Sequence, residues 1–254
     1  MNAQRWTRIV YPVVGIVLIV AAWHFYVSVF KVHPAVMPAP GKVLDSIFKD
    51  WQLLFRESWT TLLECIYGFT LAVVVGILIA VTVTASRTLN LMFYPILIAT
   101  QSIPKVAIAP IVLVWFGTGM ESKIAIAFIV AFFPMVVDTA TGLRATPEDL
   151  LDLARSLKCT RWQIFWKIQL PSALPYVFSG AKVAVTLAVI GAVIGEFVGA
   201  NSGLGNLVLV ANAQVNSALV WASLVYLSAL GMLLYAVVVI AERFLMPWVD
   251  SGHR

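Results

Sequence analysis

Charge is scarce in this sequence. Only 11% of its 254 residues are charged, whereas 61% are hydrophobic. A water-soluble domain usually carries about 25% charged residues, because its surface has to face water. So much apolar surface would aggregate unless lipid solvated it. Composition therefore excludes a soluble domain and predicts an all-α protein that lies in a membrane.

Chemically reactive groups are also few. The chain has two cysteines and three histidines, and their spacing does not match a metal site. It contains neither the GxxxxGK[ST] phosphate loop nor the GxSxG turn, and its 12 acidic residues are not grouped for acid–base chemistry. We therefore expect no catalytic residue, no metal site and no cofactor bound by this chain, which argues against a membrane-embedded enzyme.

The net charge of +5 does not indicate a nucleic-acid partner. Lysine and arginine accumulate in the cytoplasmic loops of membrane proteins, so a basic membrane protein is the ordinary case. Here the positive residues are spread between apolar runs and form no dense cluster. We expect the lipid bilayer, and no nucleic acid, among the partners.

Long apolar runs divide the chain into six expected transmembrane helices. A helix needs about 20 mostly apolar residues to cross the hydrocarbon core. The first run is not followed by a small-residue cleavage site, which favours an uncleaved span over a signal peptide. Prolines interrupt the third run, and neighbouring helices can compensate for such breaks. The runs are Val10–Phe30, Thr61–Ala85, Leu91–Phe116, Lys123–Val137, Lys182–Val198 and Val220–Ala241.

The distribution of positive charge predicts how these spans are oriented in the membrane. Six spans place both termini on one side, and the segments on that side hold eleven of the 17 lysines and arginines, against five on the other. The excess predicts that both termini are cytoplasmic. The expected parts are a first helix (1–30), an outer loop (31–59), a core of five spans (60–245) whose longest inner loop covers 139–176, and a cytoplasmic tail (246–254).

The outer loop should contain a short amphipathic helix. Val43, Ile47, Trp51 and Leu54 recur at helical spacing, which is typical of a helix at the membrane surface. Such a helix either covers the bundle or docks a partner, and the pattern leaves both open.

Small residues mark the faces on which the helices should pack. Lipid gives helices no hydrophobic reason to associate, so close approach at small residues holds them together. The glycines of these stripes are Gly68 and Gly76 in the second span and Gly191, Gly195 and Gly199 in the fifth. The two halves of the chain show no obvious repeat, which weakens an inverted-repeat secondary transporter without excluding it. An autonomous secondary transporter or channel stays open as an alternative function.

The inner loop is predicted to form two short helices. Thr146 and Pro147, followed by two acidic residues, resemble a helix start with a hydroxyl cap and proline at the first position. Thr160 and Gln163 form a capping box that begins the second helix, which Pro171 is expected to end. The first helix carries an apolar face of Leu150, Leu153, Ala154 and Leu157. This pattern alone fits either docking to a partner or binding to lipid head groups.

The same loop resembles the EAA motif of ABC importer permeases, E-A-A-x3-G-x9-I-x-L-P. Lys158 stands where glycine is usual, and a positive φ there would cost about 1 kcal/mol. The other matching residues are Asp152, Leu153, Ala154, Ile168, Leu170 and Pro171.

Further segments resemble the nitrate/sulfonate/taurine group of these permeases over about residues 35–245. They are 37–40, 102–110, 115–119, 195–197 and 203–205. The resemblance implies a type I importer fold, and a coupling helix in this loop that docks on an ATPase. It also implies an inner-membrane homodimer served by two ATPase subunits, which bind ATP and Mg²⁺, and by a periplasmic binding protein. The implied substrate is a small anion such as a sulfonate, nitrate, a taurine-like compound or an aromatic carboxylate.

Four polar residues are candidates for the translocation pathway. Lys105 lies near the middle of the third expected span beside Gln101 and Ser102, and a charge at that depth is costly. It either lines a path for an anion or holds the helix kink by snorkelling or pairing. Glu196, near the outer end of the fifth span, either binds the amides of residues 201–205 or lines an outer gate.

Overall fold

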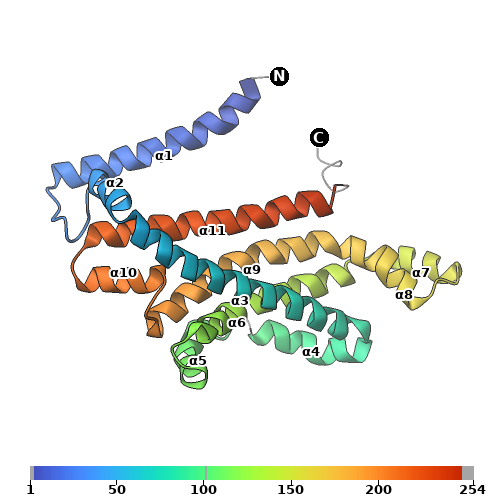
Figure 1. The fold of residues 1–254 in the computed structure, drawn as a ribbon. Coiled ribbons are helices and arrows are strands. Elements are labelled where there is room, and N and C mark those ends of the chain that lie inside the picture. The colour runs from blue at the N-terminus through green and yellow to red at the C-terminus, as the bar shows by residue number, and fades with distance from the viewer. Residues whose placement is uncertain (1–2, 101, 248–254) are drawn as a thin grey trace.

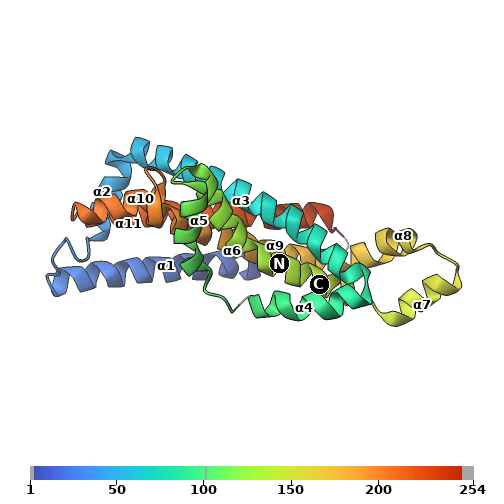
Figure 2. The ribbon, with the colours of Figure 1, turned by 90° about the horizontal axis from the view of Figure 1, so that it is seen from below.

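The computed structural model describes residues 3–100 and 102–247, and no strand occurs in these ranges (Figures 1 and 2). The helical elements are α1 (Ala3–Val29), α2 (Pro40–Lys49), α3 (Trp51–Ala85), α4 (Arg87–Thr100), η1 (Lys105–Ile108), α5 (Ala109–Phe116), α6 (Met120–Arg144), α7 (Glu148–Ser156), α8 (Arg161–Ile164), η2 (Phe165–Gln169), α9 (Leu170–Gly199), α10 (Leu204–Ala213) and α11 (Ser217–Leu245).

Five continuous helices are long and apolar enough to cross a membrane, and a bent pair forms a sixth candidate. The bent pair joins Thr88–Thr100 to Lys105–Phe116 at an angle of 87°. Figure 1 shows α3 ending at the right of the view and α6 beginning at the left, so the pair carries the chain between the two ends. The starts of α1 and α4 and the ends of α3 and α11 point toward one end of the bundle.

The third span is therefore not the single helix expected over Leu91–Phe116. Pro104 has no amide hydrogen, and its ring restricts Ile103 to extended backbone. The helix accordingly stops at Thr100, and Pro104 has φ −68° and ψ 92°, outside the helical region. Pro95 is accommodated inside α4, and Pro110 lies in the first turn of α5, where a missing amide costs little.

The expected amphipathic helix of the outer loop is also divided. It ends at Lys49, and a new helix begins at Trp51 and continues as the long span α3. Asp50 separates the two: its side chain accepts a hydrogen bond from Ser46 Oγ at 3.0 Å. Such local bonds compete with helix continuation. Val43 and Leu54 are buried, whereas Trp51 is exposed, so the predicted face belongs to two helices.

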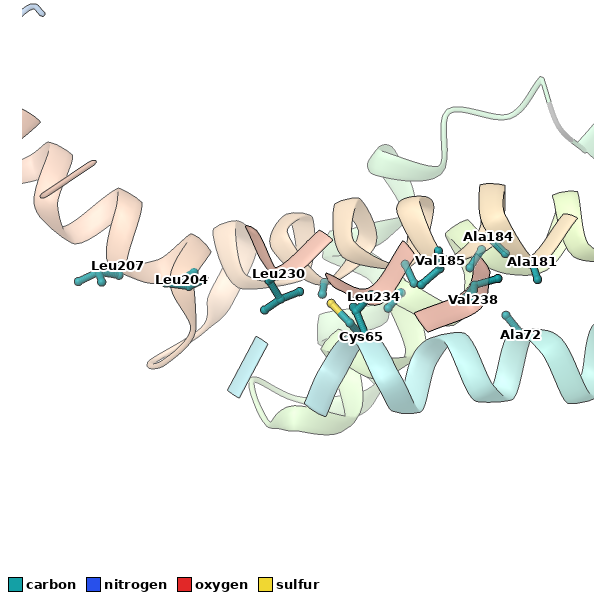
Figure 3. Packing of buried hydrophobic residues seen from close by; sticks show 14 of the residues in the cluster. Cys65, Ala72, Ala181, Ala184, Val185, Leu204, Leu207, Leu230, Leu234 and Val238 are labelled. Carbon is teal, nitrogen blue, oxygen red and sulfur yellow. The ribbon is translucent and has the colours of Figure 1, made fainter. Parts of the chain in front are cut away.

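The centre of the molecule is a contact of three helices. α3 and α9 each pack along α6, and α11 lies against α9, α10 and α2. Figure 3 shows the small and medium side chains of α3, α9 and α11 meeting in the core, Ala72, Ala184 and Val238 among them. α1 stands apart: it contacts α2, and its Trp23 packs against Trp221 with ring centroids 4.8 Å apart.

Glycines allow this close packing. A Cβ on Gly191 would lie 2.7 Å from Ala127 Cα, and one on Gly68 would lie 2.5 Å from Ala127 Cβ, so α3 and α9 both approach α6 at Ala127. Gly195 faces Lys123 in the same way. Gly76 faces Met135 and Gly199 faces Leu113.

Candidate functional site

α7, α8 and η2 form a hairpin (148–169) that projects beyond one end of the bundle in both ribbon views (Figures 1 and 2). It is shorter than the expected loop of 139–176, because α6 continues to Arg144 and α9 begins at Leu170. The second hairpin helix runs directly into α9, so that residues 161–199 form one helix of 39 residues.

Pro171 was expected to end the second helix, and the structure corrects this. A π-helical turn over Phe165–Gln169 precedes the proline, and Leu170 N–H bonds back to Phe165 O. A π turn shifts the hydrogen-bond register and leaves room for a ring that an α-helical turn would clash with. Ile168, Leu170 and Pro171 are all half-buried in this continuous helix.

The start of the first hairpin helix also differs from expectation. Pro147, rather than Thr146, is the N-cap, and no side chain caps the helix. The Thr146 hydroxyl is buried and has no hydrogen-bond partner. Proline fixes the backbone here and leaves the threonine one residue too early to reach the free amides. The Thr160–Gln163 capping box, by contrast, is present in both directions.

The turn between the two helices is a Schellman motif with lysine in the glycine position. Lys158 N–H donates to Arg155 O at 2.9 Å, and Cys159 N–H donates to Ala154 O at 3.1 Å. Lys158 has φ +56°. Glycine is usual there because a Cβ is strained at this φ, by about 1 kcal/mol. The hairpin thus keeps the standard helix ending at the cost of local strain.

The residues expected to form the apolar face of α7 are not all buried. Ala154 is 3% exposed, whereas Leu150, Leu153 and Leu157 are 40%, 57% and 70% exposed. The three leucines lie on one side of the helix, at intervals of three and four residues. We call them the leucine stripe. Asp152, beside the stripe, is exposed and forms an ion pair with Arg155 at 2.7 Å.

The three candidate pathway residues that the structure describes, Ser102, Lys105 and Glu196, are not in hydrogen-bond contact with one another. Lys105 is the first residue of η1, at the break rather than in mid-helix, and it is half-buried with its ammonium 5.3 Å from the ring centroid of Phe133. Ser102 is exposed in the turn before it. Gln101 lies outside the described residues.

Glu196 lies far from Lys105 in the sequence and takes part in a buried polar cluster. It is 1% exposed and accepts hydrogen bonds from Gly205 N–H and, at 2.6 Å, from Thr61 Oγ1. Thr61 Oγ1 in turn accepts from Leu204 N–H at 2.9 Å, and Glu57 accepts from Gly203 N–H at 2.7 Å. The cluster therefore ties the turn between α9 and α10 to α3. We call this set of bonds the turn latch.

Three further charged residues belong to this region, Glu57, Glu64 and Lys123. Glu57 lies in the expected outer loop (31–59), Lys123 is the first residue of the fourth expected span, and Glu64 lies within the second, so no pattern brings the three together. Lys123 is 2% exposed and donates to the carbonyls of Thr118, Gly119 and Gly199, and Glu64 is 2% exposed with no hydrogen-bond partner for its Oε2 among the described residues. The available signal was a charged residue inside or beside an apolar span, because such a group requires buried partners.

Comparison with known proteins places this arrangement in a family. The model of the family described as "Binding-protein-dependent transport system inner membrane component" matches residues 72–251. A probable ABC transporter permease protein from Haemophilus influenzae is 36% identical, over 88% of this chain and 90% of that protein. The formylaminopyrimidine transport permease ThiX from Halalkalibacterium halodurans is 34% identical, covering 93% and 95%.

Two more distant proteins show the same relationship. A putative aliphatic sulfonates transport permease, SsuC from Bacillus subtilis, is 29% identical over 92% of this chain and 86% of its own length. An inward-facing structure of the MetNI methionine ABC transporter aligns with a TM-score of 0.60 and 26% identity, over 77% of this chain and 97% of the matched chain. The chain therefore belongs to the binding-protein-dependent inner membrane component family and is a multi-pass permease of an ABC importer with a type I fold.

Proposed function

We propose that two copies of this chain form the translocation pathway of an ATP-driven importer, and that the hairpin docks each copy on a separate ATPase subunit. The leucine stripe carries this proposal. It is an exposed apolar face on a helix that projects from the bundle, and such faces mark sites of protein contact. The family is a transport family, and the chain has no phosphate loop with which to hydrolyse ATP itself.

The docking proposal fixes the orientation. The hairpin end must face the cytoplasm of the bacterial inner membrane, where ATP is available. The start of α1 and the end of α11 point toward that same end, so both termini are then cytoplasmic, in line with the positive-charge excess. The turn latch lies at the periplasmic end, where a substrate-binding protein would deliver its cargo.

Charge substitution in the leucine stripe tests the docking. We expect that Leu153→Asp combined with Leu157→Asp abolishes co-purification of the ATPase, because two desolvated carboxylates oppose an apolar contact. The control is Ser156→Asp, which adds a carboxylate to the same exposed helix outside the stripe. Capture of the ATPase is measured by pull-down with tagged permease at matched expression. Undiminished capture by the double variant would reject the hairpin as the docking site.

We further propose that the solute is a small anion. Lys105 supports this: it is the positive charge at the helix break, and a charge within a span is expected to face a polar path or a partner. The sulfonate permease is a relative whose name states such a substrate. An uncharged heterocycle is the second candidate, favoured by the ring of Phe133 beside Lys105 and by the formylaminopyrimidine permease.

A ligand screen on the cognate binding protein separates the two solute classes. We expect sulfonates, nitrate or aromatic carboxylates to raise its melting temperature by several degrees, since a ligand that binds only the native state stabilises it. Uncharged pyrimidines serve as the comparison set in the same thermal-shift assay. Stabilisation by pyrimidines alone would overturn the anion assignment and leave the permease assignment intact.

A further inference from the structure

A pair of adjoining cavities lies between the hairpin and the ends of α3 and α6. Their volumes are about 410 Å³ and about 690 Å³. We call them together the hairpin pocket. The residues that line both cavities are Val81, Thr84, Ala85, Leu151, Phe165 and Gln169.

The lining of the hairpin pocket is positively charged. Arg144 lines the smaller cavity, and Arg155 and Arg161 line the larger one. One carboxylate, Glu148, also lines the smaller cavity, and Asp152 binds Arg155 at 2.7 Å. Three guanidinium groups face two carboxylates, Glu148 and the Asp152 bound to Arg155, so one positive charge is in excess, which favours an anionic occupant.

One buried hydroxyl in the pocket has no partner. Thr146 is 5% exposed, lines the smaller cavity, and forms no hydrogen bond through Oγ1. A buried polar group left unpaired is unfavourable, so it signals a partner that binds there. The hydroxyl does not cap α7, as its sequence position had suggested, so it remains able to donate to a ligand oxygen.

The remaining walls suit an amphiphile at the membrane surface. Val81, Ala85 and Leu151 are apolar, and Phe165 packs with Trp162 and Trp166 in an aromatic cluster with centroid separations of 5.4 to 6.3 Å. Aromatic clusters are enriched where a membrane protein meets the headgroup layer. Basic pockets between transmembrane helices at that level are typical sites for anionic lipid headgroups.

We propose that the hairpin pocket binds the phosphate group of an anionic phospholipid. In the smaller cavity Arg144 attracts the phosphate and Thr146 donates a hydrogen bond to it, while Arg155 and Arg161 of the adjoining cavity add to the electrostatic attraction and the acyl chains lie along the apolar wall. Leu151 and Arg155 lie on the opposite side of α7 from the leucine stripe, so lipid and ATPase contact different faces. The choice of the cytoplasmic leaflet rests on the proposed orientation, whereas the binding itself does not.

Lipid binding is measured on the purified full-length permease by native mass spectrometry. We expect phosphatidylglycerol adducts in preference to phosphatidylcholine adducts, and a fall of about 30-fold in phosphatidylglycerol affinity for Arg155→Gln with Arg161→Gln. The control is Lys167→Gln with Arg243→Gln, which removes two exposed positive charges outside the pocket. Equal losses in the two double variants, equal binding of the two lipids, or binding of inorganic phosphate in place of lipid would each overturn the proposal.

A second variant tests the site without changing its charge. Thr146→Val preserves the shape of the side chain and removes the unpaired hydroxyl. We expect its melting temperature in lipid-free detergent to equal or exceed that of the wild type, because no hydrogen bond is lost. The extra stabilisation that phosphatidylglycerol gives the wild type should shrink at the same time. An unchanged response to the lipid would show that Thr146 does not contact it and would contradict the proposed site.

Discussion

Replacing Gly191 by leucine is expected to prevent the helix bundle from assembling. Even a single Cβ at this position would lie 2.7 Å from Ala127 Cα, which is backbone of α6 and cannot turn aside. Overpacking of a core usually costs 1–3 kcal/mol, and a whole leucine against the backbone should cost about 3 kcal/mol or more. That is a large share of a typical stability of about 5–15 kcal/mol.

Gly231→Leu provides the matched control. Gly231 lies inside α11, and a Cβ there would meet nothing within 4 Å. The same substitution should be tolerated there, and it also removes a residue with poor helix propensity. Thermal unfolding and size-exclusion profiles in detergent compare the two variants. A Gly191→Leu permease as stable and monodisperse as Gly231→Leu would show that α6 and α9 do not approach each other at this point.

The central packing could be predicted because its cause is local in the sequence. Glycines four residues apart, such as Gly191 and Gly195, share one face of a helix whatever surrounds it, and lipid favours packing on that face. The existence of the spans follows from apolar runs for the same reason. The ends of the helices could not be predicted in this way: α3 begins at Trp51 and α9 at Leu170, outside the expected spans. Helices extend beyond the hydrocarbon core wherever their backbone hydrogen bonds continue to form.

The candidate sites were predictable only in part. The Thr160 capping box and the lysine at the hairpin turn depend on residues within a few positions, and both are read from the sequence. Leu153 is exposed and Ala154 is buried because of the way α7 packs against the bundle. The spacing of residues within the hairpin does not predict that packing. The turn latch joins Thr61 to Glu196, 135 residues apart, and a single sequence gives no sign of that contact.

Substitution of Glu196 by alanine is expected to destabilise the permease by about 3 kcal/mol. It leaves the buried amide of Gly205 without an acceptor and removes the hydrogen bond between Thr61 and Glu196. Leu204 N–H still donates to Thr61 Oγ1 at 2.9 Å and Gly203 N–H to Glu57 at 2.7 Å, so part of the latch persists. Thermal unfolding in detergent measures the loss, with expression level as a supporting readout.

The Glu196→Gln variant tests the contribution of the hydrogen bonds in the absence of the carboxylate. The glutamine oxygen can accept from Gly205 N–H while its amide donates to Thr61 Oγ1, whose own hydrogen then goes to Glu57 O. We therefore expect the glutamine variant to keep nearly the wild-type melting temperature, and a loss as large as that of the alanine variant would reject this account. Reconstituted transport then distinguishes the two roles of Glu196. If the glutamine variant is stable and transports normally, Glu196 acts only in the turn latch. If the variant is stable and fails to transport, the carboxylate of Glu196 is required in the outer gate.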